Sequence, residues 1–403
     1  MEATQQQTNN SALGSENSKN AGTTNTRETK QASGKQLVAI IFILAMATKM
    51  FLLPIFLIQA SGRDGYLILT VYGVFDLITL VPMIIAIRKC DVDFFELLSS
   101  VIGKVGAKIV VAIIGLFLFF KLNTAVAEIL NFYGTNVLAD FDTSLMIIVL
   151  LVFFAAAGTH TLRSLSRLNE ILMPIIVVCL AVLVAIVVLT GFDLGNILPA
   201  VADGKGFTAA LLKHPAWVGD FTPLVLFIGR TKTKKYTWCF AAGSGIIGTG
   251  IAVFFAIALS AAFGNVPMLI DSTTNLSNIL QFSVGNVYGR LDMFSSVVWS
   301  VSVFIEAALF FYATCRCVSF VIGKNAHFII SLCACVATYV VQVFALTDPM
   351  ILSLCVTSYA CAIITPTMAV GIPVLALVCA AVYNKKHKKA AYNRRGGNRH
   401  DCA

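Results

Sequence analysis

Apolar residues form ten long runs along the chain, and short polar or charged segments separate them. Each run approaches the roughly 20 residues that an α-helix needs to cross a lipid bilayer. The expected spans are residues 36–60, 65–87, 108–136, 144–159, 170–190, 217–229, 237–263, 293–315, 327–346 and 350–383. This pattern predicts an all-α integral membrane protein with ten transmembrane helices.

Polar segments flank the predicted membrane domain, which covers residues 36–384. Residues 1–35 are rich in Gln, Asn, Thr and Ser and lack an apolar stretch, so we expect a disordered N-terminal tail and not a signal peptide. Residues 385–403 form a basic cytoplasmic tail. This tail either anchors the topology or binds anionic membrane lipid, and the anchor is the simpler explanation.

The composition agrees with a membrane protein. Of the 403 residues, 58% are hydrophobic and 12% are charged, whereas soluble domains carry about 25% charged residues. The net charge of +9 arises from short basic clusters between apolar runs, without interleaved aromatic residues. We therefore expect the basic residues to orient the protein in the membrane, and we expect no nucleic-acid partner.

The basic residues are also distributed unevenly between the two sides of the membrane. If the N-terminus is cytoplasmic, 23 of the 29 Lys and Arg residues lie in cytoplasmic segments, 4 lie on the other side and 2 lie within spans. An excess of Lys and Arg is typical of cytoplasmic loops. The distribution predicts an even number of spans with both termini in the cytoplasm.

Motifs of enzymes and cofactor sites are absent or have a simpler explanation. Gly243, Gly245 and Gly248 match a dinucleotide fingerprint, but they open an apolar span, where small residues allow close helix packing. The 5 His residues are scattered, and most of the 11 Cys residues lie inside apolar runs. The sequence therefore predicts no catalytic residues, no metal site, no cofactor and no enzymatic activity.

Two of the spans contain helix breakers in corresponding positions. Ten spans divide into two halves of five. Because each half has an odd number of spans, the second half enters the membrane from the opposite side and is inverted relative to the first. Span one contains Lys49 and Pro54, and span six contains Gly219 and Pro223. A simple proline kink is the alternative, but two matching breaks favour a substrate site, where half-helix N-termini suit a ligand carboxylate. The expected ligand-binding residues are Met50, Phe51, Pro54, Thr124, Glu128, Gly219, Asp220, Thr222 and Pro223.

Charged residues inside the apolar spans form a second candidate feature. Lys121, Thr124 and Glu128 share one face of span three, Glu306 lies in span eight, and a charge at the bilayer centre usually faces a partner or a pathway. These groups either line a polar cavity or lock the helices together, and the two roles can coexist. We expect the Lys49 ammonium to pair with Glu128 or Glu306, with snorkelling to the cytoplasmic interface as the alternative. The expected charge network is Lys49, Lys121, Glu128 and Glu306.

Five short motifs occur in order along the chain. They are Gly62-Arg63-Asp64-Gly65-Tyr66-Leu67, Ile102-Gly103-Lys104, Arg167 to Glu170 with Pro174, Leu198-Pro199, and Gly289-Arg290-Leu291-Asp292 with Trp299. With the ten-span frame, and over roughly residues 31–385, they resemble the GerAB-type family. Members of that family are B subunits of spore-germination nutrient receptors, grouped with amino-acid permeases of the APC superfamily.

The resemblance implies properties that the residue pattern does not supply. It implies a LeuT-like five-plus-five inverted repeat, an amino acid or similar small germinant as ligand, and A-type and C-type germination receptor subunits as partners. It also implies the spore inner membrane as location. A stand-alone proton-coupled amino-acid permease is the alternative function, because both functions use the same fold. A purely structural membrane protein is a third and weaker hypothesis.

Overall fold

The computed structural model describes residues 32–50, 52–61, 64–136, 142–189, 194–198, 204–213, 215–232, 236–263, 291–323, 326–346 and 357–397. Nearly all of the described chain is helical. The elements are β1 Ala32–Ser33, α2 Gly34–Met46, α3 Leu52–Ser61, α4 Gly65–Lys89, α5 Phe94–Ile102, α6 Lys104–Asn136, α7 Thr143–Thr159, α8 Leu162–Leu189, the 3-10 helix η2 Leu194–Ile197, α9 Gly204–Lys213, the 3-10 helices η3 Pro215–Trp217 and η4 Thr222–Phe227, β2 Thr231–Lys232, α10 Thr237–Phe263, α12 Leu291–Ile322, α13 His327–Val341, the π-helix η7 Gln342–Leu346 and α15 Tyr359–Gly397.

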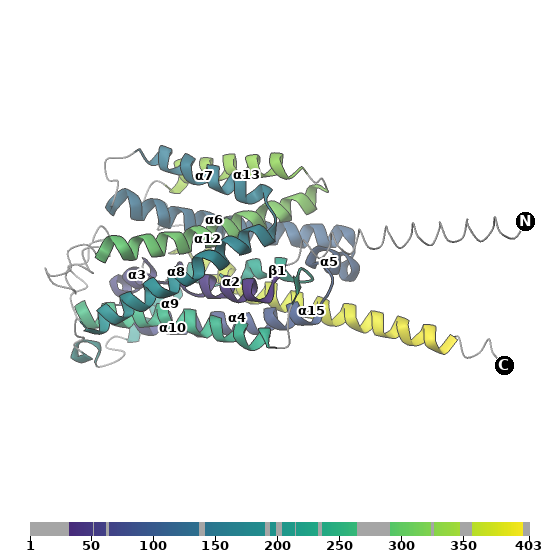
Figure 1. The fold of residues 1–403 in the computed structure, drawn as a ribbon, viewed down its shortest axis with the longest axis horizontal. Coiled ribbons are helices and arrows are strands. Elements are labelled where there is room, and N and C mark those ends of the chain that lie inside the picture. The colour runs from purple at the N-terminus through teal and green to yellow at the C-terminus, as the bar shows by residue number, and fades with distance from the viewer. Residues whose placement is uncertain are drawn as a thin grey trace, which may run out of the picture.

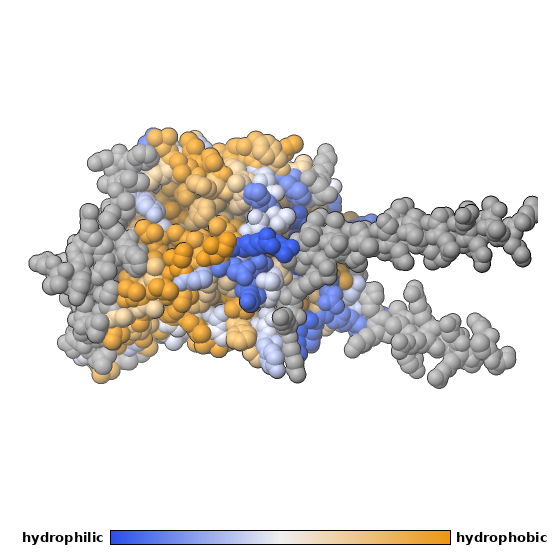
Figure 2. Space-filling model, in the orientation of Figure 1, coloured by the Kyte–Doolittle hydropathy of each residue, from blue (hydrophilic) through white to orange (hydrophobic). Residues whose placement is uncertain are grey.

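The long helices run side by side and form an elongated bundle (Figure 1). Seven of the described helical stretches are long and apolar enough to cross a membrane, namely α4, α6, α8, α10, α12, α13 together with η7, and α15. Apolar side chains cover much of the flank of the bundle, and hydrophilic side chains gather near the end from which α15 projects (Figure 2). The protein is thus a multi-pass, essentially all-α membrane protein, whereas the count of ten crossings stays a prediction.

Several helices extend beyond the predicted spans. α6 begins at Lys104 instead of residue 108, α8 begins at Leu162 instead of residue 170, and α12 continues to Ile322 instead of residue 315. The added turns contain Lys and Arg residues, whose long side chains reach water while the backbone stays helical. Hydropathy alone therefore placed these helix ends too close to the membrane centre.

Both predicted tails differ from the structure at their inner edges. The described chain begins at Ala32, so residues 1–31 of the tail expected over residues 1–35 lie outside the described residues. The Ser33 side chain accepts a hydrogen bond from the Gln36 amide, and this capping box starts α2 at Gly34. At the other end, α15 continues through the start of the basic segment at residue 385 to Gly397.

A two-residue parallel ladder connects the segment before α2 to the segment after η4. β1 pairs with β2, and the Ala32 amide donates to the Arg230 carbonyl at 2.8 Å. Nearby, the side-chain amide of Gln36 donates a hydrogen bond to the Glu170 carboxylate on α8 at 2.9 Å. Because β1 precedes α2 and β2 follows η4, the ladder connects two interrupted segments at the end of the bundle that carries α5 (Figure 1).

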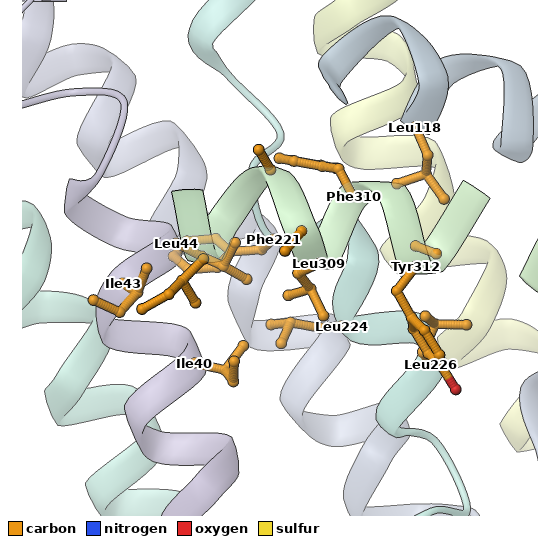
Figure 3. Close-up of a cluster of buried hydrophobic side chains, with 14 of the residues drawn as sticks. Ile40, Ile43, Leu44, Leu118, Phe221, Leu224, Leu226, Leu309, Phe310 and Tyr312 are labelled. Carbon is orange, nitrogen blue, oxygen red and sulfur yellow. The ribbon is translucent and has the colours of Figure 1, made fainter. Parts of the chain in front are cut away.

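The apolar core surrounds these interrupted segments. Side chains of α2 and α12 lie around Phe221 and the η4 residues Leu224 and Leu226, and Leu118 of α6 lies across α12 from Leu224 and Leu226 (Figure 3). Leu224 and Leu226 are fully buried, as are Leu309 and Phe310 of α12. Irregular backbone at this depth is therefore shielded from lipid by protein, as a membrane interior requires.

Candidate functional site

Span one is interrupted by a short turn. α2 ends at Met46, residues 47–50 form a turn, and α3 begins at Leu52. The break therefore lies before Pro54, the helix breaker in the sequence of span one, and Lys49 lies inside it. Proline is tolerated in the first turn of a helix, where its missing N–H would have no partner, so Pro54 marks the start of α3 and not the break itself.

Span six is interrupted over a longer stretch. Helix α9 at Gly204–Lys213 precedes the predicted span 217–229, and within that span the described chain forms only the 3-10 helices η3 and η4. Gly219 lies between them with φ of +89°, a conformation that side chains disfavour. Pro223 stands in the first turn of η4. Polar residues at the start of α9 concealed this helix in the sequence.

The two breaks meet through buried ion pairs. Lys49 Nζ lies 2.6 Å from Asp76 Oδ2 on α4 and 2.6 Å from Asp220 Oδ2. Lys121 Nζ on α6 lies 2.5 Å from Asp220 Oδ1. All four side chains are at most 3% exposed. Asp220 thus bridges both lysines, and it joins span one, span three and span six.

This pairing corrects the prediction for Lys49. Glu128 and Glu306 were the expected partners, but Asp76 and Asp220 take that place. Snorkelling is also wrong, because the Lys49 side chain is 1% exposed. The prediction relied on helical faces, and Lys49 and Asp220 both lie where the chain is not α-helical, so their spacing along the sequence did not reveal the contact.

Backbone groups freed by the breaks bond to the same side chains. The Gly219 amide donates to Asp76 Oδ1 at 2.8 Å, and Lys121 Nζ donates to the Ala216 carbonyl at 2.9 Å. Thr48 Oγ1 donates to Asp220 Oδ2 at 3.3 Å. Asp76 was not among the candidate site residues, although a lone aspartate in an apolar span was a sufficient signal.

The two glutamates have a different environment. Trp217 Nε1 donates to Glu128 Oε1, which leaves Glu128 Oε2 without a hydrogen-bond partner among the described residues. The Glu306 side chain is fully buried, and neither of its carboxylate oxygens has a hydrogen-bond partner among the described residues. Glu306 interacts electrostatically with Asp220, Lys121, Lys49 and Glu128, so all of them belong to one cluster.

The remaining predicted site residues are placed as follows. Met50 and Thr222 are buried, and the Thr222 hydroxyl lacks a hydrogen-bond partner within the described chain. Pro54 and Pro223 are buried beside the breaks, whereas Thr124 is half-buried and donates to its own helix at the Lys121 carbonyl. Phe51 lies outside the described residues. No group of three or more metal-ligating side chains occurs in the described ranges.

A separate polar pocket of about 600 Å³ lies at the end of the bundle that carries α5. Its lining includes Asp93, Glu96, Arg230, Arg316 and His327. Arg230 and Asp93 form a partly exposed ion pair there. The charge cluster differs from this pocket because it is closed to solvent: none of its six ionisable side chains is more than 6% exposed. These six residues are Lys49, Asp76, Lys121, Glu128, Asp220 and Glu306.

Solved transporter structures resemble this fold. The manganese transporter of Eremococcus coleocola, in complex with an aromatic bis-isothiourea substituted compound, has a TM-score of 0.51 at 11% identity over 86% of this chain and 76% of that chain. The inward-facing conformation of Mhp1 has a TM-score of 0.38 at 12% identity over 89% of this chain and 92% of that chain. The first similarity confirms the predicted LeuT-like transporter fold.

The sequence also matches a protein family. The family model described as "Spore germination protein" matches residues 31–349. Among curated proteins, none matches the chain. The match starts before α2, ends after η7 and includes both broken segments, so it contains the whole charge cluster. This protein therefore belongs to the spore germination protein family.

Proposed function

We propose that this protein is the B-type subunit of a spore-germination nutrient receptor, and that it binds an amino acid or a similar small germinant where its two broken segments meet. The observation that carries the proposal is the 2.6 Å contact between Lys49 of the first break and Asp220 of the second. Interrupted helices that meet within a membrane are the usual place of a ligand site in transporters, because their backbone groups lack helical hydrogen-bond partners. The family match supplies the link to germination.

The six ionisable side chains at the breaks are closed off from solvent in this structure. A ligand therefore reaches the breaks in a more open conformation, and it stabilises the conformation for which it has the higher affinity. A receptor subunit needs only this shift between two states to signal to its partners. The proposed partners are the A-type and C-type subunits, and the proposed location is the spore inner membrane.

The direct test is calorimetric titration of the purified full chain in lipid nanodiscs with each common amino acid. We expect at least one to bind, and we expect Thr222→Val to weaken that binding, because it removes a buried hydroxyl that lacks a partner in the described chain. Thr338→Val is the matched control, since its buried hydroxyl bonds to its own helix at Ala334. Absence of binding by all amino acids at millimolar concentration would contradict the proposal.

The second candidate is a proton-coupled amino-acid permease, because the fold is shared with transporters. An uptake assay separates the two functions. It uses proteoliposomes that contain this chain alone and the labelled amino acid that binds in the calorimetric titration. A receptor subunit gives binding without sustained uptake. Uptake that depends on a pH gradient would favour the permease.

The proposed orientation places both termini in the cytoplasm, on the basis of the uneven distribution of Lys and Arg. Reporter fusions at residues 20 and 395 test it, and both are expected to report the cytoplasmic side. A fusion that reports the external side at either position would contradict an even number of crossings.

A further inference from the structure

The charge cluster at the breaks contains more acids than bases. Its two lysines, Lys49 and Lys121, are matched by Asp76 and Asp220 through ion pairs of 2.5–2.6 Å. Glu128 and Glu306 remain, and each lacks an ion pair within the described residues. If every group is ionised, the cluster therefore carries two uncompensated negative charges.

The packing of α6 against α12 places the two glutamates close together. The rings of Phe132 and Trp299 lie 4.7 Å apart, and Lys121 Nζ lies 6.0 Å from the centre of the Phe310 ring. From the first contact to the second, the residue number falls by eleven on α6, from 132 to 121, and rises by eleven on α12, from 299 to 310. The two helices are thus antiparallel over this stretch.

This register puts Glu306 opposite residue 125 of α6, three residues from Glu128. Three residues correspond to about 4.5 Å along a helix axis. The electrostatic interaction between Glu306 and Glu128 agrees with this placement. Glu306 and Glu128, here called the carboxylate pair, therefore lie at nearly the same level of α12 and α6 and share the cluster that contains Asp220.

Burial makes this pair unstable unless a positive charge or a proton joins it. Glu306 is fully buried and Glu128 is 6% exposed, and three of their four oxygens have no hydrogen-bond partner in the described chain. An ionised carboxylate in such a place needs a cation or loses its charge by binding a proton. Lys49 and Lys121 already form ion pairs with Asp76 and Asp220, so their positive charges do not fully compensate the two glutamates.

We propose that Glu128 and Glu306 bind the cationic group of the ligand, so that the protein selects amines and zwitterions with a free ammonium over anions. This inference rests on the proposed function and specifies its ligand class. The ammonium fits because it offers three donors to the three unpartnered oxygens. A ligand that carries only a carboxylate meets repulsion from both glutamates and finds the two lysines occupied.

The test compares three probes with similar three-carbon skeletons on the purified full chain: n-propylamine, L-alanine and propionate. We expect propylamine to raise the thermal unfolding midpoint and propionate to leave it unchanged. Glu306→Gln is expected to weaken propylamine binding at least ~10-fold, the loss typical of a hydrogen bond to a charged group. The same change removes an uncompensated buried charge, so its own unfolding midpoint stays equal or rises.

Two further variants sharpen the test. Glu128→Gln keeps an oxygen that accepts from Trp217 Nε1 and loses the charge, so it is expected to weaken propylamine binding without disturbing that contact. Glu96→Gln makes the same substitution on the exposed face of α5 and is expected to change nothing.

Three results would overturn the inference: equal stabilisation by propylamine and propionate, unchanged propylamine binding in Glu306→Gln, or absence of any effect of propylamine on the wild-type protein. The proposed function is judged separately, because the calorimetric amino-acid titrations reveal a ligand whether or not the glutamates bind its ammonium.

Discussion

Two regions of this protein contain ion pairs of the same length in different surroundings. In the charge cluster, Lys49 lies 2.6 Å from Asp220, and the two side chains are 1% and 0% exposed. In the polar pocket near α5, Arg230 lies 2.6 Å from Asp93, but these side chains are 20% and 28% exposed. The distances are the same, and the access of water differs.

Access of water decides what each pair contributes to stability. An exposed pair typically contributes about 0–1 kcal/mol, because water already solvates both charges. Removing one partner of a buried pair costs about 3–5 kcal/mol, because the other charge stays behind without compensation. Substitutions in the cluster are therefore expected to have far larger effects than matching substitutions in the pocket.

The largest effect is expected for Asp220→Asn. Asp220 pairs with both Lys49 and Lys121, so its neutralisation leaves Lys121 without an ion pair in the described chain, and its hydrogen bond to the Ala216 carbonyl remains. We expect a loss of about 3–5 kcal/mol in the free energy of unfolding, measured by denaturant titration in detergent. Asp93→Asn in the pocket is the control, with an expected loss below about 1 kcal/mol. Equal losses in the two variants would contradict the comparison.

The next effect concerns Lys49→Met, which keeps bulk and removes charge. Asp76 then loses its only ion pair in the described chain, whereas Asp220 keeps Lys121. We expect a loss of about 3 kcal/mol and partial recovery on addition of Asp76→Asn, because the second change removes the stranded charge. A double-mutant cycle on unfolding free energies measures the coupling. Additive effects of the two substitutions would show that Lys49 and Asp76 are not coupled.

A smaller effect is expected from the backbone of the second break. Gly219 has φ of +89°, and a Cβ there would lie 3.0 Å from the Ala369 Cβ. Gly219→Ala is therefore expected to lower the free energy of unfolding by about 1–2 kcal/mol. Gly243→Ala on α10 is the control, because no atom lies within 4 Å of its added Cβ and alanine favours a helix interior. If Gly219→Ala left the free energy of unfolding unchanged, the backbone of the second break would adapt easily to a side chain.

The sequence predicted much of the fold for identifiable reasons. Apolar runs located the long helices, and the breakers Pro54 and Gly219 indicated which spans are interrupted. The sequence analysis did not predict α9, because Gly204 and Lys205 lower the hydropathy of this segment. Helix ends such as Lys104 were also misplaced, because charged residues can extend a helix into the membrane interface.

The candidate site was predicted only in part. Helical spacing placed Lys121 and Glu128 on one face of α6, and both lie in the charge cluster. Spacing gave no access to the contact between Lys49 and Asp220, because each lies in a segment without α-helical periodicity. Which carboxylate a lysine selects depends on how two breaks face each other, and that is a property of the tertiary structure.

The smallest effect is expected for Arg230→Gln, which sharpens the comparison from the exposed side. The substitution removes the pair with Asp93 but leaves the hydrogen bond from the Ala32 amide to the Arg230 carbonyl, so the ladder between β1 and β2 persists. We expect a loss below about 1 kcal/mol in the free energy of unfolding at low salt. Raising the ionic strength to about 1 M shortens the screening length to about 3 Å, so the difference from the wild type is expected to disappear. The loss caused by Asp220→Asn is expected to persist at the same ionic strength, because salt does not reach a cluster closed to water. If high salt reduced both losses equally, the charge cluster would be open to solvent, and the contrast between the two regions would be wrong.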